Sequence, residues 1–307
     1  MEQTTSAFIA IVGRANVGKS SIINKILGTK VAIVSDKPQT TRTRIMGVLT
    51  QNEKQFVFVD TPGFHKPRNL LGQNMMKAVG SGMSDVDAVM LVVEAAPKFS
   101  FDKDNLPSAE LELINEIKRR KLKSFLVINK VDLLEDKEIL FEIITAYTNV
   151  HNFDAVIPVS AKTGDGISII VGESEKYLKS SPHYFSEDDV TDQNDKTMVA
   201  EIIREKLLRS LDKEIPHGIA VDIERFFERD TAEGEPILEV EATIYCEKDS
   251  HKGIVIGKQG SMLKKIGIRA RHDIEEFFGI RASVKLWVKV KDDWRNRQGI
   301  IHSFGLD

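Results

Sequence analysis

The sequence has little cysteine, no long apolar run and no large excess of either charge. Cys246 is the only cysteine among 307 residues, which excludes an internal disulfide and favours a reducing compartment such as the cytosol. The apolar run Ala7–Gly13 is far shorter than the roughly 20 residues that a transmembrane helix needs, and no secretory signal pattern accompanies it. We therefore expect no transmembrane segment. The formal net charge of −3 gives the whole chain no evident preference for polyanions.

The length suggests about two domains, and the first half alternates short apolar runs with helical patterns. Continuous apolar runs without polar alternation are typical of strands that are covered on both faces, as in a parallel sheet wrapped by helices. The runs are Ala7–Gly13, Gln55–Asp60, Ala88–Val93, Ser124–Asn129 and Ala155–Ser160. The helical patterns lie near Lys19–Leu27, Asn74–Ser81, Pro107–Lys121, Lys137–Thr148 and Ile167–Lys179. Ligands of such sheets bind at the carboxyl ends of the strands.

The first chemical motif is a phosphate-binding loop between an apolar run and a helical pattern. The letters GRANVGKS match G-x-x-x-x-G-K-[ST], in which glycines let backbone N–H groups turn toward phosphate oxygens at a helix N-terminus. The lysine reaches the β and γ phosphates, and the hydroxyl of the last residue ligates Mg²⁺. The predicted loop residues are Gly13, Arg14, Ala15, Asn16, Val17, Gly18, Lys19 and Ser20.

A second motif, Asp60-Thr61-Pro62-Gly63, closes the next apolar run. Asp60 is placed to hold Mg²⁺ through water, and the Gly63 N–H to bond the γ phosphate, so that loss of this phosphate would release the loop. By itself this tetrapeptide is equally a good turn sequence.

Two later loops predict guanine recognition. Asn129-Lys130-Val131-Asp132 ends a further run, and a carboxylate at Asp132 can accept hydrogen bonds from guanine N1–H and the exocyclic amine, which adenine lacks at that edge. Asn129 would tie this loop to the phosphate loop, and Lys130 would pack over the ring. The predicted contact with guanine O6 comes from a backbone N–H of Ser160-Ala161-Lys162. Helix capping is the plain alternative for the Asn and the Asp.

The chain changes character after residue 179. Residues 180–197 are polar, acidic and aperiodic, which predicts a linker. A helix, two strands, a glycine loop with a helix, and a strand are expected beyond it. The loop Gly257-Lys258-Gln259-Gly260 is of the G-x-x-G type, which lets a nucleic-acid backbone approach closely. The basic residues Lys264, Lys265, Arg269 and Arg271 follow the loop, and the first three are the further predicted RNA contacts.

The charge of this half is strongly asymmetric. Residues 248–297 carry 13 Lys and Arg against 6 Asp and Glu, whereas residues 198–247 carry 6 against 13, so the two parts cancel. A basic half favours RNA binding, although an internally salt-bridged domain would show the same counts. Trp287 and Trp294 are candidates for base stacking, with burial the commoner fate of tryptophan.

Together these motifs resemble the translation-factor-related GTPases and, within them, the Era family. The resemblance implies a P-loop GTPase domain with a mostly parallel sheet (α/β) at 1–179, a linker at 180–197 and a smaller α+β KH domain of type II at 198–307. The segment Ser35–Arg44 resembles the first switch of that family. By this likeness Thr41, with Thr40 as the alternative, is the second protein ligand of Mg²⁺ beside Ser20.

The resemblance also implies the reaction, hydrolysis of GTP to GDP and phosphate, with Lys19, Thr41, Asp60 and Gly63 as its central residues. Phe64 stands where many GTPases carry a water-orienting glutamine, so we expect slow intrinsic turnover. Related GTPases with an asparagine placed like Asn16 use K⁺, and simple loop capping is the alternative for this residue. Ala15 replaces the usual proline without removing a ligand.

The family implies a GTP-controlled factor that binds 16S rRNA near its 3′ end and assists maturation of the 30S ribosomal subunit. A mainly cytoplasmic monomer is expected, with some peripheral association at the inner face of the cell membrane. Two other functions remain open from the residues themselves. One is an RNA-binding scaffold with a merely structural nucleotide site, and the other is a GTPase whose C-terminal domain recruits a protein.

Overall fold

The structure is a computed structural model that describes residues 4–95 and 106–307. The chain divides into two compact units. The first comprises Met1–Ala32, Thr41–Lys66 and Met75–Asp192, and the second comprises Ile33–Thr40, Pro67–Asn74 and Gln193–Asp307. Two short segments of the N-terminal half thus belong, by their contacts, to the second unit.

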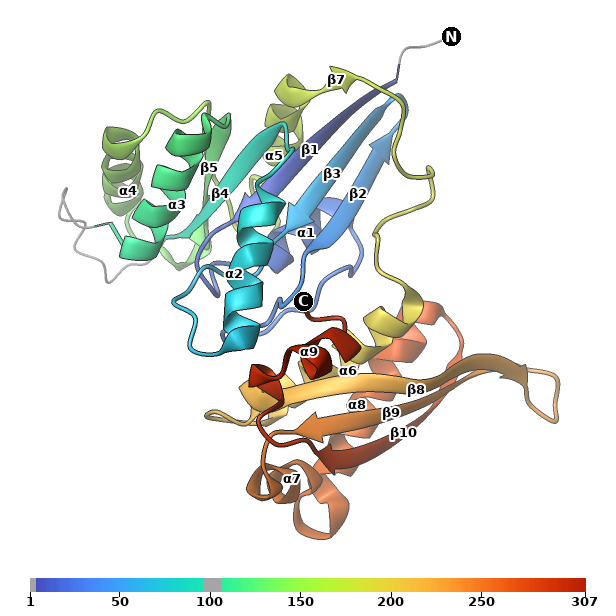
Figure 1. Cartoon of the computed structure of the whole chain (residues 1–307). Coiled ribbons are helices and arrows are strands. Elements are labelled where there is room, and N and C mark those ends of the chain that lie inside the picture. Colours follow the sequence, from blue (N-terminus) through green and yellow to red (C-terminus); the bar gives the residue numbers. More distant parts are fainter. Residues whose placement is uncertain (1–3, 96–105) are drawn as a thin grey trace. The chain divides into compact units, whose positions relative to one another are not determined.

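The first unit is built on a seven-stranded sheet (Figure 1). Its strand order is β2-β3-β1-β4-β5-β6, with β7 beside β1. β2 and β7 run antiparallel to their neighbours, and the other pairs are parallel. The strands are β1 (Thr5–Val12), β2 (Ile45–Gln51), β3 (Lys54–Asp60), β4 (Ala88–Glu94), β5 (Ser124–Asn129), β6 (Val156–Pro158) and β7 (Lys179–Ser180).

Helices cover both faces of this sheet, which is why its central strands are apolar without alternation. Alternate residues of β1 and β4 enter two separate cores, one that includes α1 and α5 and one that includes α2, α3 and α4. The helices are α1 (Lys19–Leu27), α2 (Leu70–Gly82), α3 (Ser108–Arg120), α4 (Lys137–Val150) and α5 (Ile167–Ser174). Within the described ranges, no helix combines the length and apolar character needed to cross a bilayer.

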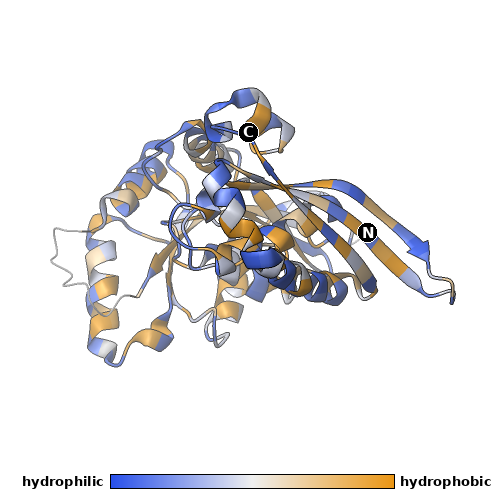
Figure 2. Ribbon diagram, turned by 90° about the horizontal axis from the view of Figure 1, so that it is seen from below, coloured by the Kyte–Doolittle hydropathy of each residue, from blue (hydrophilic) through white to orange (hydrophobic). Residues whose placement is uncertain are grey.

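The second unit has a three-stranded sheet of order β10-β9-β8, in which β9 and β10 are parallel and β8 and β9 antiparallel. Helices α6 and α8 pack on one face and share its core. Figure 2 shows hydrophobic and hydrophilic residues alternating along these long strands, as expected for a sheet with one face toward water. The elements are α6 (Asp195–Ser210), β8 (Ile219–Asp230), β9 (Pro236–Cys246), α7 (Asp249–Ile256), α8 (Ser261–Phe278), β10 (Arg281–Val290) and α9 (Gln298–Ser303).

The segment 180–197, expected as a linker, is more ordered than its composition suggests. The Val48 N–H donates to the Val190 carbonyl at 2.9 Å, and the Met46 N–H donates to Asp192 Oδ1 at 2.9 Å. The segment therefore lies along the edge strand β2, and α6 begins inside it at Asp195. Strand β2 itself was not predicted, although its first five residues are apolar apart from Gly47.

The suggestion that Trp294 stacks on bases is wrong. Its side chain is fully buried, and its indole N–H donates to the Gly218 carbonyl at 2.9 Å. The ring lies edge-on to Phe304, with centroids 5.5 Å apart. Trp287 on β10 is instead 56% exposed. One tryptophan therefore belongs to the core of the second unit, and the other to its surface.

We expect Trp294→Ala to lower the free energy of unfolding of the second unit by about 3–5 kcal/mol, because it empties a large buried site and leaves the Gly218 carbonyl without its donor. Urea unfolding followed by circular dichroism measures the change. Trp287→Ala is the matched control and should alter stability by no more than about 0.5 kcal/mol. Equal losses for the two variants would contradict the assigned burial.

Candidate nucleotide site and nucleic-acid groove

The phosphate loop follows β1 and runs directly into α1, as its motif predicts. A Cβ at Gly13 would lie 2.3 Å from the Val92 carbonyl oxygen, and one at Gly18 would lie 2.1 Å from Asn129 Nδ2. Gly18 also has a φ of 97°, in the region that favours glycine. These two glycines are required by close approach as well as by backbone conformation.

Lys19 is buried at the first position of α1 and rests on the loop itself. Its Nζ donates to the carbonyls of Gly13 at 3.2 Å and Arg14 at 3.0 Å. Burial lowers the pKa of Lys19 to about 8, and the nearby Asp60 carboxylate only partly opposes this shift. The lysine is thus held without full charge compensation, a condition that anionic phosphates would relieve.

Three oxygen-bearing side chains from separate segments meet next to this lysine. Ser20 Oγ donates to Asp60 Oδ2 at 2.7 Å and lies 2.9 Å from Thr41 Oγ1. Thr41 Oγ1 is also 3.4 Å from Asp60 Oδ2. The Thr40 hydroxyl instead donates to the Lys37 carbonyl at 2.6 Å. The geometry therefore favours Thr41 over Thr40 as the threonine of the predicted metal site.

This donor set fits Mg²⁺, which prefers oxygen ligands and retains several waters. Asp60 Oδ1 is buried, with no hydrogen-bond partner among the described residues. Burial raises the pKa of Asp60, against the effects of Lys19, Ser20 and Thr41. An unpartnered buried carboxylate oxygen is costly, and a hydrated cation would satisfy it. Asp60 would hold the cation through water, and the hydroxyls of Ser20 and Thr41 would be its direct ligands.

The loop Asp60–Gly63 packs tightly against the phosphate loop. The Thr61 hydroxyl donates to the Ile11 carbonyl at 2.7 Å, and a Cβ on Gly63 would lie 2.6 Å from the Cα of Ala15. The next residue, Phe64, turns its ring toward the core formed with α2, α3 and α4. This ring can neither orient a water nor donate to a phosphate, in agreement with the sequence-based expectation.

The base-recognition loops follow β5 and β6 and meet at one buried side chain. Asn129 Nδ2 donates to the Val17 carbonyl at 2.8 Å, and its Oδ1 accepts from the Ala161 N–H at 3.0 Å. Lys130 Nζ pairs with Glu94 Oε1 at 2.9 Å. The phosphate loop, the Asn129–Asp132 loop and the Ser160–Lys162 loop therefore form one site.

Ser160 has a role that its sequence position did not disclose. Its hydroxyl donates to Asp132 Oδ1 at 2.6 Å, while Asp132 itself is exposed. The bond restrains the orientation of the Asp132 carboxylate. The signal available in the sequence was a hydroxyl residue at the end of an apolar run, which is too common to interpret.

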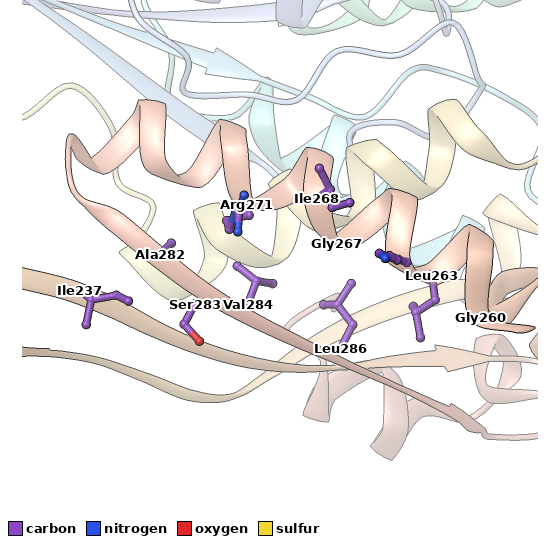
Figure 3. Close-up of a pocket in the computed structure, with 11 residues that line it drawn as sticks. Ile237, Gly260, Leu263, Gly267, Ile268, Arg271, Ala282, Ser283, Val284 and Leu286 are labelled. Carbon is purple, nitrogen blue, oxygen red and sulfur yellow. The ribbon is translucent and has the colours of Figure 1, made fainter. Parts of the chain in front are cut away.

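The second unit contains an open groove of about 670 Å³ between α8 and β10 (Figure 3). Its helix side carries Gly260 of the G-x-x-G loop together with Lys264 and Arg271, and its strand side carries Ser283 and apolar residues. The remaining lining residues are Ile237, Leu263, Gly267, Ile268, Ala282, Val284 and Leu286. A basic rim over an apolar floor suits unstacked bases and their phosphates.

Only some of the predicted RNA contacts line this groove. Gly257, Lys258 and Gln259 lie in the turn that leads into α8, directly before Gly260. Lys265 and Arg269 do not line the groove, and contact with RNA stays a prediction for all of these residues. The residues at 260, 263, 264, 267 and 271 share one helical face. Arg271 was noted among the basic residues after the glycine loop but was not predicted as a contact, although this spacing places it on the groove side of α8.

Fold and sites together define a P-loop GTPase that carries a C-terminal KH domain. Comparison with family models agrees, since residues 8–130 match a "50S ribosome-binding GTPase" family and residues 214–295 match a KH domain family. The GTPase Era of Ruminiclostridium cellulolyticum is 45% identical over 98% of this chain and 97% of its own length. That of Clostridioides difficile is 45% identical over 98% of both chains. The chain belongs to the Era family of GTPases.

Solved structures agree over the whole chain. An Era structure in complex with MgGDPNP and nucleotides 1506–1542 of 16S ribosomal RNA has a TM-score of 0.91 at 34% identity, over 99% of both chains. An Aquifex aeolicus Era variant bound to GDP and AlF4⁻ has a TM-score of 0.90 at 33% identity, again over 99% of both chains. The resemblance drawn from the sequence motifs and the predicted fold class are confirmed.

We expect Asp132→Asn to weaken GTP binding about 10²-fold and to favour xanthine nucleotides, because the guanine donors would face an amide in place of a carboxylate. Calorimetric titration with GTP and xanthosine triphosphate measures both affinities. Asp136→Asn is the control, since Asp136 caps α4 by accepting from the Glu138 N–H at 2.8 Å. Unchanged preference for GTP in Asp132→Asn would refute the base assignment.

GTP affinity should fall as the pH rises above about 8. Lys19 in the free protein has a pKa of about 8, and bound phosphates would raise this pKa. At a pH between the free and the bound pKa, GTP binding therefore requires the uptake of a proton by Lys19. Below pH 8 the lysine is protonated in both states and contributes no pH dependence. Titration from pH 7.5 to 9 tests this slope. The Lys19→Arg side chain stays charged throughout this range, so its GTP affinity should lack this contribution to the pH dependence. Titration of the guanine base affects both proteins equally and cancels in the comparison.

Proposed function

We propose that this protein is a GTP-hydrolysing, RNA-binding factor that attaches near the 3′ end of 16S rRNA and assists maturation of the 30S ribosomal subunit. The observation that carries the proposal is the presence, in one Era-family chain, of an assembled guanine-nucleotide site and a basic groove behind a G-x-x-G loop. The Era structure with a GTP analogue and a 16S rRNA fragment supports both halves.

Hydrolysis of GTP to GDP and phosphate would depend on electrostatic stabilisation more than on a general base. Lys19 leaves its loop carbonyls to contact the β and γ phosphates, and the Gly63 N–H bonds the γ phosphate. Bound Mg²⁺ would supply charge neutralisation between the β and γ phosphates, with Ser20, Thr41 and Asp60 holding it. With Phe64 turned into the core, turnover is slow. Asn16 lies exposed on the loop, where K⁺ could add positive charge.

The RNA groove would take single-stranded RNA. The G-x-x-G turn brings the backbone of the RNA close to the protein, and Lys264 and Arg271 neutralise phosphates along one helical face. Apolar residues such as Ile268, which is 53% exposed, offer surface to the unstacked bases. Double-stranded RNA would present only its phosphates and hydroxyls to this floor.

GTP control of RNA binding would run through the segment Ile33–Thr40, which precedes the metal-site residue Thr41 in the chain. Within the second unit, Arg204 of α6 donates to the Thr40 carbonyl, and Glu205 Oε1 accepts from the Val34 N–H at 3.1 Å. Ordering of Thr41 by nucleotide would therefore act on a segment attached to α6. Linkage makes such coupling reciprocal, so RNA improves GTP affinity by the same factor.

Further parts of the proposal follow from family likeness. The protein would act as a monomer in the cytoplasm, where ribosomal subunits are assembled, with peripheral association at the inner face of the cell membrane.

We expect Lys258→Asp/Gln259→Asp to abolish binding of an RNA fragment from the 3′ end of 16S rRNA, because two carboxylates would face the phosphates. Lys264→Ala should weaken binding and reduce the salt dependence by about one ion. Fluorescence anisotropy measures affinity with a GTP analogue and with GDP. GTP turnover should be unchanged in these variants.

Lys265→Ala is the control, one position along α8 and outside the groove, and should lose less affinity than Lys264→Ala. Equal losses would indicate that Lys265 also contacts RNA and would argue against the groove as the RNA-binding site. Unchanged RNA affinity in the Asp double variant would favour a protein partner for this domain instead.

A further inference from the structure

A fully buried glutamate lies behind the phosphate loop. The side chain of Glu110, in the first turn of α3, has no exposure to solvent. The Arg14 Nε, from the second residue of the phosphate loop, donates to Glu110 Oε1 at 2.5 Å. The Tyr147 hydroxyl, from α4, donates to Glu110 Oε2. Three elements that are distant in sequence therefore meet at one carboxylate.

Stability by itself does not explain this carboxylate. Its neighbours on the inner face of α3, Leu113 and Ile114, belong to an apolar core to which α4 also contributes. Burying a charge there is costly, and an apolar side chain of similar volume is often as good or better for stability. Burial, then the Glu110 charge and hydrogen bond, raise the pKa of Tyr147, so the phenol stays protonated as a donor.

Arg14 is the part of this group that reaches the reaction centre. Its carbonyl accepts from Lys19 Nζ at 3.0 Å, and its backbone forms a parallel bridge with Phe64. The Phe64 N–H donates to the Gly13 carbonyl at 3.0 Å. An anchored Arg14 side chain thus holds the first turn of the phosphate loop, and with it the positions of Lys19 and of the residue after Gly63.

We propose that Glu110 and Tyr147 are positioning residues for GTP hydrolysis, acting through Arg14 on the first turn of the phosphate loop. The inference rests on the proposed GTPase function. The Glu110 carboxylate neutralises the charge of the Arg14 guanidinium and holds it against α3. The Arg14 side chain therefore anchors the loop and does not contact the nucleotide.

The effect should appear in kcat more than in KM. In the ground state, several N–H groups of the phosphate loop bind the phosphates together, so a small shift of one turn changes substrate affinity little. The transition state is less tolerant, since a displacement of about 1 Å can cost on the order of 10²-fold in rate. An interaction that matters mainly in the transition state lowers kcat and leaves KM nearly unchanged.

The test is the double variant Glu110→Leu/Tyr147→Phe in the full chain, which removes the carboxylate and the hydroxyl together and keeps the volume apolar. We expect kcat to fall at least tenfold, KM to change less, and resistance to urea to be kept or increased. Amide hydrogen exchange at residues 13–20 should become faster in the nucleotide-free protein. Arg14→Lys, which keeps the charge but loses the planar fork, should change kcat in the same direction.

Glu116→Gln is the matched control, because Glu116 lies on the same helix and pairs with Arg119 and Arg120 at the surface. It should leave kcat and loop exchange unchanged. Unaltered kcat and exchange in the double variant would overturn the inference, as would a loss of rate that follows an equal loss of stability. Absence of turnover in the unsubstituted protein would refute the proposed function instead, and the exchange rates would still decide whether Glu110 anchors the loop.

Discussion

The nucleotide site depends on both polar atoms of one buried side chain. Asn129 donates through Nδ2 to the phosphate loop and accepts through Oδ1 from the Ser160–Lys162 loop. The three loops leave the sheet after β1, β5 and β6, and the Ser160–Asp132 bond joins only the last two. A purine nucleotide presents phosphates and base at a fixed separation, so a protein that reads both ends must fix the distance between its loops. The Asn129 amide provides this connection inside the first unit.

The same site holds polar groups that are incompletely satisfied in the free protein. Burial lowers the pKa of Lys19 and raises that of Asp60, which shows that each charge is held away from water with partial compensation. A bound nucleotide and cation would supply the missing counter-charges at these positions. Such preorganisation costs stability in the free protein and makes the charged ligands bind more favourably, since little rearrangement is left to do on binding.

The charge asymmetry of the second unit has two causes. Lys285 pairs with Glu241 and Lys289 with Glu224, so the basic strand β10 and the acidic strands β8 and β9 partly neutralise one another across the sheet. The alternative of an internally salt-bridged domain is therefore correct for the outer sheet face. Lys264 and Arg271 lie elsewhere, on the helix side of the groove, where their charge is available to the proposed RNA ligand.

Much of the fold and most of the nucleotide site could be predicted from the sequence, because motifs such as the phosphate loop are contiguous and carry their own backbone requirements. Helix α1 and strand β5 have the predicted bounds, since apolar runs and glycines act locally. The edge strand β2 was missed although Ile45–Leu49 forms a short apolar run, because such a run does not by itself distinguish a strand from a helical segment.

The sequence by itself determined the class of protein, the nucleotide-binding loops and the glycine turn of the second domain. Only the tertiary structure decided that Thr41 and not Thr40 joins Ser20 and Asp60, that Trp294 is buried, and which basic residues of α8 line the groove. It also brought Glu110 and Tyr147 to Arg14. The reason is physical: a local motif specifies its own backbone, whereas contacts between distant residues depend on how the helices and strands pack.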